Sequence, residues 1–216
     1  EAQSIAIALE KELKPKRPLT HDLFKNFAER FNIYVKQVII HKLVDGVFYA
    51  SIICEHDKIE EIIDSILAIK GLHEKYKNIQ EVILQNFQPK PDTVMKDVPS
   101  ANEEYFKKIV ALTRIIIPQM NIQIPPNLSP RSYQSFLQVG INDWGGISPL
   151  TPDFVNPEFS WPEINKVEEN SKKAGFDLKC RFPIYPEFLS FINKKLRDKI
   201  AVIENEEGYV KEEYWR

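Results

Sequence analysis

Amide side chains gather at the ends of several short apolar runs in this sequence. Amides both donate and accept hydrogen bonds, so they suit the edge of a heterocycle and the hydroxyl groups of a sugar chain. One carboxylate, Asp143, lies among them, and we expect it to be a catalytic residue that handles a proton or anchors a substrate. We predict that the substrate is bound by eight residues: Gln85, Asn86, Gln123, Asn127, Asn142, Trp144, Ser148 and Thr151.

Each of these residues also has an ordinary structural role open to it. Asn and Gly are common turn residues, and Gln often satisfies buried backbone groups. The same polar character at four predicted strand ends nevertheless favours a ligand pocket. Prolines and the Gly145-Gly146 pair would fix the shapes of the loops around it.

Other catalytic motifs are absent from the sequence. There is no glycine-rich phosphate loop, no Gly-x-Ser-x-Gly elbow and no HExxH. The four histidines show no metal-ligand spacing, so we predict no metal site. Two widely separated cysteines, Cys54 and Cys180, are typical of reduced thiols in a cytoplasmic protein.

Charge and hydropathy argue against a membrane partner, and they leave nucleic acid as a partner only under a nuclease alternative. The formal net charge is -2 and the pI is near 6.2, which gives no basic surface for nucleic acid or anionic lipid. No apolar stretch approaches the roughly 20 residues that span a bilayer. We therefore expect a small-molecule substrate and no membrane contact.

From Asp57 onward, helical and strand patterns alternate along the chain. Ile59, Ile62 and Ile66 recur at helical spacing and predict a long first helix. Strand, helix, strand in succession implies parallel βα units, and hence an α/β fold with a doubly wound sheet or a barrel. In both folds, chemistry collects beyond the carboxyl ends of the strands. The predicted strands are Ile79–Leu84, Met120–Ile124, Ile141–Trp144 and Asp177–Phe182, and the helices between them are Glu103–Ile117, Ser132–Val139 and Trp161–Ala174.

The first part of the chain is predicted to contain two helices and then a β-hairpin. Asp45-Gly46 separates Tyr34–Val44 from Val47–Ile53, and an Asp-Gly pair between two such runs is typical of a type I′ turn. Pairing outward from that turn places Leu43 opposite Phe48, His41 opposite Ala50, and Ile39 opposite Ile52.

Several strings after Asp57 follow one another in an order typical of one enzyme family. They are Ile79–Phe87 with Pro89-Lys90-Pro91, Asn121–Leu128, Gly140–Pro149, Trp161-Pro162 and Pro183–Glu187. Over about residues 57–209 the chain resembles the CofG-type subunit of radical-SAM FO synthase (7,8-didemethyl-8-hydroxy-5-deazariboflavin synthase). The resemblance implies a partial TIM barrel that closes the ring of a tyrosine–ribitylaminopyrimidinedione adduct, with loss of ammonia, in deazaflavin coenzyme biosynthesis.

The resemblance also implies two cofactors. FO synthases use S-adenosylmethionine and a 4Fe-4S cluster that is held by the cysteines of a CxxxCxxC motif. No such motif occurs in this sequence. We therefore expect a lyase by family that is inactive alone, with the missing N-terminal half of the barrel as its partner.

The beginning of the chain resembles a second family. Ala2 with Ile5–Leu9, Lys16–Leu23, Val38–His41 and Asp45–Ala50 are similar to the bifunctional nuclease (BFN) domain. The resemblance implies a nuclease that acts on DNA or RNA, and under that alternative Arg17, His21 and Asp22 are its candidate site residues.

The two resemblances divide the chain into a partial BFN-like α+β segment at residues 1–54 and the C-terminal half of a radical-SAM barrel at residues 55–216. No Gly-, Ser- or Pro-rich linker separates them, which favours a join of two incomplete segments over a fusion of whole domains. Three functions stay open: an FO synthase subunit, a BFN-type nuclease, and a non-catalytic binding protein or chimeric fragment.

Overall fold

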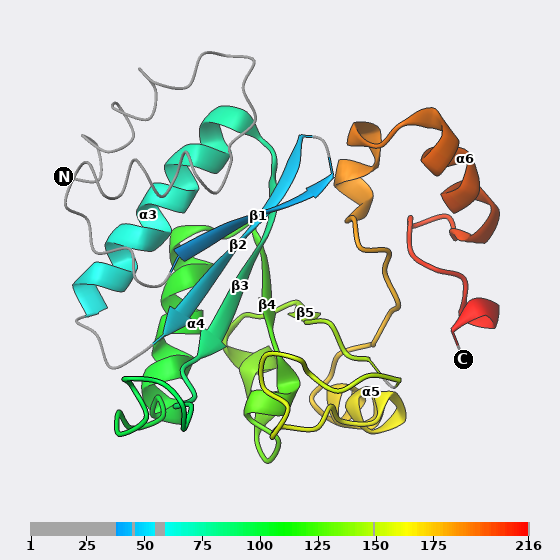
Figure 1. Ribbon diagram of the computed structural model, residues 1–216. Coiled ribbons are helices and arrows are strands. Elements are labelled where there is room, and N and C mark those ends of the chain that lie inside the picture. Colours follow the sequence, from blue (N-terminus) through cyan, green and yellow to red (C-terminus); the bar gives the residue numbers. More distant parts are fainter. Residues whose placement is uncertain (1–37, 45, 55–58, 149, 216) are drawn as a thin grey trace.

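The centre of the molecule is a five-stranded sheet with the strand order β1-β2-β3-β4-β5 (Figure 1). The computed structural model describes residues 38–44, 46–54, 59–148 and 150–215. The α/β fold class predicted from the sequence is confirmed. β1 (Val38–Val44) is antiparallel to β2 (Val47–Cys54), whereas β2, β3 (Ile79–Asn86), β4 (Asn121–Ile124) and β5 (Asp143–Trp144) are parallel.

Two long helices, α3 (Ile59–Tyr76) and α4 (Glu103–Ile116), cover one face of the sheet. Both have acidic residues in the first turn, where the helix dipole favours negative charge. The Asn102 side chain caps α4 by accepting hydrogen bonds from the backbone N–H groups of Glu104 and Tyr105. The helix η1 (Pro126–Leu128), the helix η2 (Tyr133–Val139) and α5 (Ile164–Lys173) lie toward the carboxyl ends of the strands.

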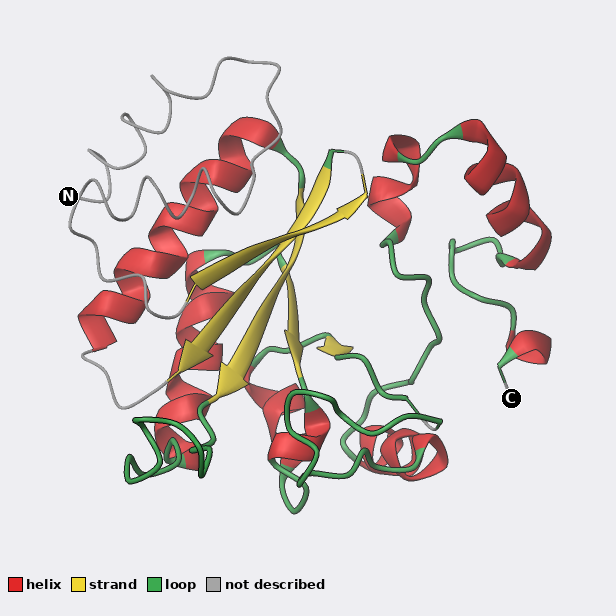
Figure 2. Cartoon of the chain, in the orientation of Figure 1, coloured by secondary structure: helices red, strands yellow, loops and turns green. Residues whose placement is uncertain are grey.

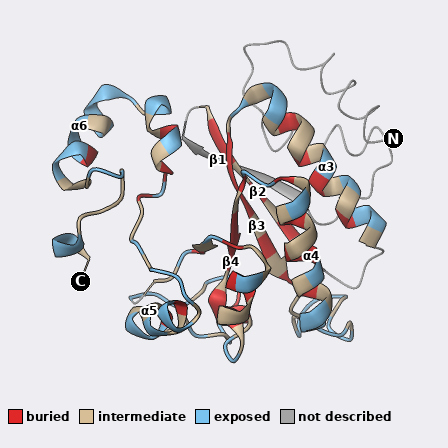
Figure 3. Ribbon diagram, turned by 180° about the vertical axis from the view of Figure 1, so that it is seen from behind, coloured by how far each residue is buried: buried red, intermediate tan, exposed pale blue. Residues whose placement is uncertain are grey.

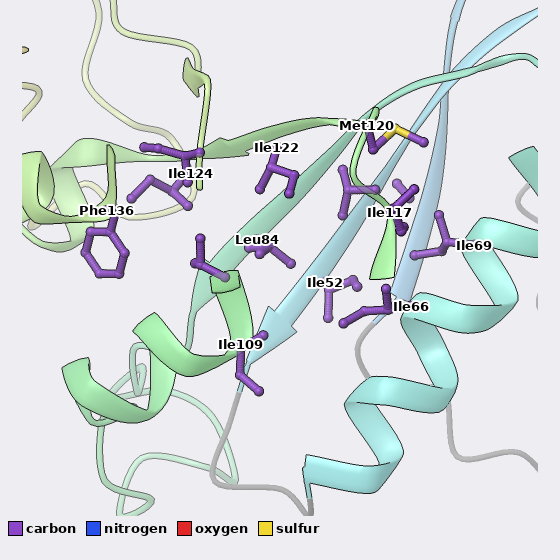
Figure 4. Close-up of a cluster of buried hydrophobic side chains, with 14 of the residues drawn as sticks. Ile52, Ile66, Ile69, Leu84, Ile109, Ile117, Met120, Ile122, Ile124 and Phe136 are labelled. Carbon is purple, nitrogen blue, oxygen red and sulfur yellow. The ribbon is translucent and has the colours of Figure 1, made fainter. Parts of the chain in front are cut away.

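The main core lies between the sheet and these two helices. Buried residues recur along α3 at Ile62, Ile66, Ile69 and Leu72, which is the spacing of one helical stripe. Figure 4 shows strand residues such as Leu84 facing the helical side chains. In Figure 3 most of β3 and β4 is buried while the outer sides of the helices are exposed. This packing fixes the sheet, and the sheet in turn positions the residues on its other face.

A second, smaller core lies at the amino end of β2. The C-terminal helices η3 (Pro186–Phe191) and α6 (Lys194–Ile203) pack there, and a short helix η4 (Glu212–Tyr214) follows them. Val47, the first residue of β2, is fully buried in this cluster. Gly46 in the hairpin turn has φ +87°, and a Cβ at this position would lie 3.1 Å from the Phe191 ring. The hairpin and the C-terminal helices therefore share one core.

The predicted hairpin forms, but the predicted register is wrong by one residue. Val44 pairs with Val47 as the Asp-Gly turn requires, and then an irregularity between Lys42 and Val44 shifts the ladder. A bulge of this kind adds one residue to one strand and moves all later pairs by one position. The observed pairs are Lys42–Phe48, His41–Tyr49, Ile40–Ala50, Ile39–Ser51 and Val38–Ile52.

A second prediction that the structure contradicts is the strand at Asp177–Phe182. This segment is a loop that rises from α5 toward η3 and joins no strand (Figure 2). Its backbone carbonyl at Cys180 is bound by the N–H of Val210 instead. The other predicted strands and helices form near their expected bounds, with Ser132–Val139 realised as the 3-10 helix η2. The two helices predicted before the hairpin lie outside the described residues.

Candidate functional site

A cavity of about 780 Å³ lies against the face of the sheet that α3 and α4 leave uncovered. Its walls come from β3, β4, β5, η2 and the segment that follows α5. Ile83, Trp144, Phe176, Leu178 and Phe182 give it apolar surface. A cavity of this size with few convergent polar groups is typical of a small-molecule site.

Strand alternation explains which side chains reach the cavity. In β3, Glu81 and Ile83 point to the cavity face while Val82 and Leu84 join the main core. The parallel pairing of β4 and β5 sets Gln123 opposite Asp143. Each of these polar positions is therefore fixed by its place in a strand.

The polar end of the cavity is a cluster of two carboxylates, one guanidinium and one phenol. Arg181 Nε donates to Asp143 Oδ2, and Arg181 NH2 donates to Glu81 Oε2 over 3.1 Å. The Tyr185 hydroxyl contacts Asp143 Oδ2 and, over 3.1 Å, Glu81 Oε2. The guanidinium carbon of Arg181 also lies 4.2 Å from the centroid of the Tyr185 ring. We call Glu81, Asp143, Arg181 and Tyr185 the acid cluster.

The acid cluster is largely removed from solvent. The side chains of Glu81, Asp143 and Arg181 are 7%, 11% and 19% exposed. Burial raises the pKa of Glu81, and the nearby charge of Asp143 raises it further, although Arg181 acts in the opposite direction. Burial acts to lower the pKa of Arg181, but the electrostatic interactions with Asp143, Tyr185 and Glu81 outweigh it and the pKa is raised. Groups with such shifts in a cavity are candidates for proton transfer.

Two tyrosines, Tyr185 within the acid cluster and Tyr49 near it, are held in the neutral form. Burial raises the pKa of Tyr185, and the charges of Asp143 and Glu81 act in the same direction. Burial and the charge of Glu81 also raise the pKa of Tyr49, which lines the cavity from β2. Both phenols can therefore donate hydrogen bonds at neutral pH.

The structure brings four of the predicted site residues to the cavity. Asp143 belongs to the acid cluster, and Gln123, Asn142 and Trp144 line the walls. In the orientation that satisfies both ends of its amide, Gln123 donates to Glu81 Oε2 over 3.3 Å and accepts from the N–H of Gly145 over 3.1 Å.

Asn142 and Trp144 also form hydrogen bonds with neighbouring residues of the chain. Asn142 Oδ1 accepts from Arg114 over 3.0 Å and from the N–H of Ile122 over 2.8 Å. Trp144 Nε1 donates to Ser171 Oγ over 3.1 Å. Both side chains are thereby fixed in place at the cavity wall.

The other five predicted binding residues lie outside the cavity lining: Gln85, Asn86, Asn127, Ser148 and Thr151. Asn86 and Asn127 donate to the carbonyls of Leu128 and Phe159 across the loops at the carboxyl ends of the strands. Ser148 Oγ accepts from the N–H and the hydroxyl of Thr151. In this structure these contacts order loops, as amides and hydroxyls commonly do in turns.

Sequence reasoning missed Glu81 as a site residue and did not connect Arg181 and Tyr185 with Asp143. A signal for Glu81 was present, because it is the one acid in a strand whose other residues are apolar or amides. No signal fixes the position of Arg181, because it lies in a loop and meets Glu81 100 residues away in the sequence. The nuclease candidates Arg17, His21 and Asp22 lie outside the described residues.

Metal ligands do not gather in the described part of the chain. No group of three His, Cys, Asp or Glu side chains is placed there to hold a metal ion. Among these same residues, no helix has the length and apolar character of a membrane span.

Comparison with known proteins gives matches to two families. Residues 1–67 match the bifunctional nuclease domain. A 7,8-didemethyl-8-hydroxy-5-deazariboflavin synthase of Methanococcus maripaludis strain C6 is 47% identical over 146 residues, which is 67% of this chain and 42% of that protein. The counterpart from Methanocaldococcus jannaschii is 43% identical over 155 residues, or 71% of this chain and 42% of the relative.

A longer relative matches the same share of the chain. The FO synthase of Streptomyces coelicolor is 40% identical over 153 residues, which is 68% of this chain and 18% of that protein. Two thirds of this chain is homologous to FO synthases. The match falls in the C-terminal part of the relatives, and the chain spans less than half of their length.

Proposed function

We propose that residues 55–216 are the C-terminal half of a radical-SAM barrel of the FO synthase type and that they supply its substrate pocket. Residues 1–54 are a BFN-like segment in this proposal. The observation that carries it is the 38–47% identity to proteins named as deazaflavin synthases over about two thirds of the chain. The substrate would be a tyrosine–ribitylaminopyrimidinedione adduct, closed to a deazaflavin with loss of ammonia.

The strand order supports a barrel over a doubly wound sheet. In a barrel, each parallel strand lies beside the next strand in sequence, whereas a doubly wound sheet reverses its order at a switch point. The parallel strands here follow the order β2-β3-β4-β5 without a reversal. This part of the sheet therefore has the connectivity of consecutive barrel strands.

The cavity suits a substrate with a flat polar ring and a hydroxylated chain. Aromatic side chains of Trp144, Phe176 and Tyr209 offer surfaces for a planar heterocycle. Asp143, Gln123 and Asn142 supply hydrogen-bonding groups on one wall. We keep Gln85, Asn86, Asn127, Ser148 and Thr151 as a proposed second contact region at the carboxyl ends of the strands.

The residues of this chain do not fit the iron–sulfur cluster of the family. A CxxxCxxC motif supplies three thiolates, and the sequence contains two cysteines. This chain alone is therefore not proposed to hold the cluster or to cleave S-adenosylmethionine. In the proposal, the residues of this chain bind and orient the substrate, exclude water from it and handle a proton at Asp143.

Ligand binding by the 216-residue chain tests this proposal. A ribitylaminopyrimidinedione is titrated while the fluorescence of Trp144 and Trp215, which both line the cavity, is followed. We expect saturable quenching, and we expect Asp143→Asn to weaken binding about tenfold or more, which corresponds to about 1.4 kcal/mol. Asp198→Asn, an exposed change on α6, is the matched control and leaves affinity unchanged. Absence of saturable binding by the unsubstituted chain sinks the proposal.

A BFN-type nuclease is the second candidate, and the match of residues 1–67 to that domain favours it. We infer that Arg17, His21 and Asp22 would carry its chemistry on DNA or RNA. The purified chain is incubated with single-stranded nucleic acid and a divalent metal. This function is supported if the chain cleaves the nucleic acid, if His21→Ala abolishes cleavage, and if His73→Ala, the control, retains it. Lack of cleavage by the unsubstituted chain rejects it.

A further inference from the structure

The Tyr185 hydroxyl lies between two acids, and this arrangement constrains their protons. Its oxygen is within hydrogen-bond distance of both Glu81 Oε2 and Asp143 Oδ2. A phenol carries one hydrogen and can donate it to only one of the two. The other contact is then a hydrogen bond only if that acid is protonated and donates to the phenolic oxygen. Two ionised acids at these positions would leave one close pair of oxygens without a hydrogen between them.

Glu81 is the acid better placed to hold the additional proton. Its side chain is the less exposed of the two, at 7% against 11%. Burial disfavours an ionised carboxyl group and raises the pKa of Glu81; Arg181 acts against this shift and the charge of Asp143 adds to it, and the net direction is upward. The hydrogen of Tyr185 is then free to point to Asp143.

We propose that Glu81, Tyr185 and Asp143 form a proton relay in which Glu81 stores a proton, Tyr185 passes it on, and Asp143 delivers it to a nitrogen base bound in the cavity. In the first step, the carboxyl hydrogen of Glu81 moves to the oxygen of Tyr185 while the phenolic hydrogen moves to Asp143 Oδ2. Glu81 becomes a carboxylate, Asp143 becomes a carboxylic acid, and Tyr185 is unchanged. In the second step, Asp143 gives that hydrogen to the lone pair of the nitrogen and returns to the carboxylate form.

Arg181 keeps the electrostatic cost of this transfer small. Its Nε faces Asp143 and its NH2 faces Glu81, so the guanidinium is adjacent to the negative charge before and after the proton moves. Arginine remains charged throughout, because its pKa here is raised. The Tyr49 phenol from β2, the Gln123 amide from β4 and the Gln80 amide from β3 also face Glu81, and all three are neutral. The cluster thus holds one movable proton beside one fixed positive charge.

The relay ends where the proposed reaction needs a proton. Asp143 lines the cavity beside Trp144, on the wall that we assign to substrate binding. Loss of ammonia from carbon requires that the departing nitrogen gain a proton. The inference therefore rests on the proposed function for its substrate, an amine or imine of a nitrogen heterocycle. The proton stored on Glu81 and the hydrogen bond between Glu81 and Tyr185 do not depend on a ligand, so they can be tested in the ligand-free protein.

Infrared spectroscopy of the full chain tests the relay without any ligand. A protonated carboxyl group gives a C=O stretching band that is separated from carboxylate and amide bands. We expect this band in the unsubstituted protein at pH 7, and we expect it to disappear in Glu81→Gln. Glu206→Gln, an exposed glutamate change, is the matched control and retains the band. A spectrum of the unsubstituted protein without the band overturns the proposal even if the Gln variant does not fold.

A second variant tests the connection to Tyr185. Tyr185→Phe removes the oxygen that accepts the Glu81 hydrogen, so the band should persist but shift in frequency. A band that is identical in the Phe variant overturns the relay, because the proton of Glu81 then has another partner. A positive infrared result together with a failed ligand titration would support the stored proton and reject the proposed substrate. The reverse pair of results would retain the substrate and reject the relay.

Discussion

Removal of the positive charge from the acid cluster should destabilise the whole protein. Arg181→Met keeps most of the side-chain volume but leaves Glu81 and Asp143 together without a cation. Loss of one partner of a buried ion pair costs about 3 to 5 kcal/mol. Arg181 is 19% exposed and Glu81 has a raised pKa, so part of the repulsion is relieved by solvent and by protonation. We therefore expect a loss of about 3 kcal/mol, the lower end of that range.

Urea unfolding at pH 7 measures this loss. With a slope of about 1 to 3 kcal/mol per molar urea, the midpoint should fall by about 1 to 3 M. Arg181→Lys keeps the charge but cannot donate to both carboxyl groups in the same planar geometry. Its urea midpoint should lie between those of the unsubstituted protein and Arg181→Met. Arg131→Met, an exposed change, should have little effect.

A double-mutant cycle shows whether the effect comes from the ion pair. Asp143→Asn removes the negative charge that Arg181 Nε faces, so Arg181→Met should cost less in that background by about 2 kcal/mol. If the two losses are additive, or if Arg181→Met alone costs less than about 1 kcal/mol, the cluster is not the electrostatic unit described above.

Three further predictions concern single positions. Burial raises the pKa of Glu81 above the 4.5 of an ordinary glutamate, so above pH 4.5 the folded state holds a proton that the unfolded state releases. The melting temperature of the unsubstituted protein should therefore fall relative to that of Glu81→Gln as pH rises above 4.5. Parallel pH profiles of the two melting temperatures would contradict this. Asn102→Ala should lower the free energy of unfolding by about 1 kcal/mol, because α4 loses its cap. Urea unfolding measures this loss, and Asn193→Ala at the cap of α6 provides a second helix cap for comparison. Gly140→Ala should lower the melting temperature, because φ is +116° and the new Cβ would lie 2.8 Å from Arg114; an unchanged value would mean that Arg114 moves aside without cost.

Local periodicity in the sequence was sufficient to predict most of the regular elements. The stripe Ile59, Ile62 and Ile66 identifies α3, and the apolar run of β3 identifies a buried strand. The hairpin register could not be predicted, because the irregularity beside Lys42 has no glycine or proline to mark it. Asp177–Phe182 has the alternation of a strand, but none of the strands in the described ranges extends along it to form a ladder.

The candidate site was predicted only in part, for a related reason. Asp143, Gln123, Asn142 and Trp144 lie in or beside regular strands, so their position follows from the strand pattern. Arg181 and Tyr185 lie in a loop and a helix boundary whose path depends on tertiary contacts. The short strand β5 brings Asp143 close to that loop, and nothing in the local sequence indicates the approach.

The central sheet contains strands from both sides of the junction between the two resemblances, and this leads to a final prediction. β2 belongs to the part that matches the BFN domain, yet it pairs with β3 over seven residue pairs. Ile52 of β2 is fully buried and pairs with Leu84 in the main core. All three tryptophans, Trp144, Trp161 and Trp215, lie after the junction, so their fluorescence reports only the FO synthase-like part.

If the two parts fold as one unit, Ile52→Ala must destabilise the part that contains the tryptophans. Truncation of a buried isoleucine costs about 2 to 5 kcal/mol, and the urea midpoint measured by tryptophan fluorescence should fall accordingly. Ser51→Ala, at the adjacent half-buried position, should change the stability by about 0.5 kcal/mol or less. An unchanged tryptophan transition in Ile52→Ala would mean that the hairpin and the FO synthase-like part unfold independently. A shifted transition would instead mean that the hairpin, whatever its origin, stabilises the sheet that positions Glu81 and Asp143.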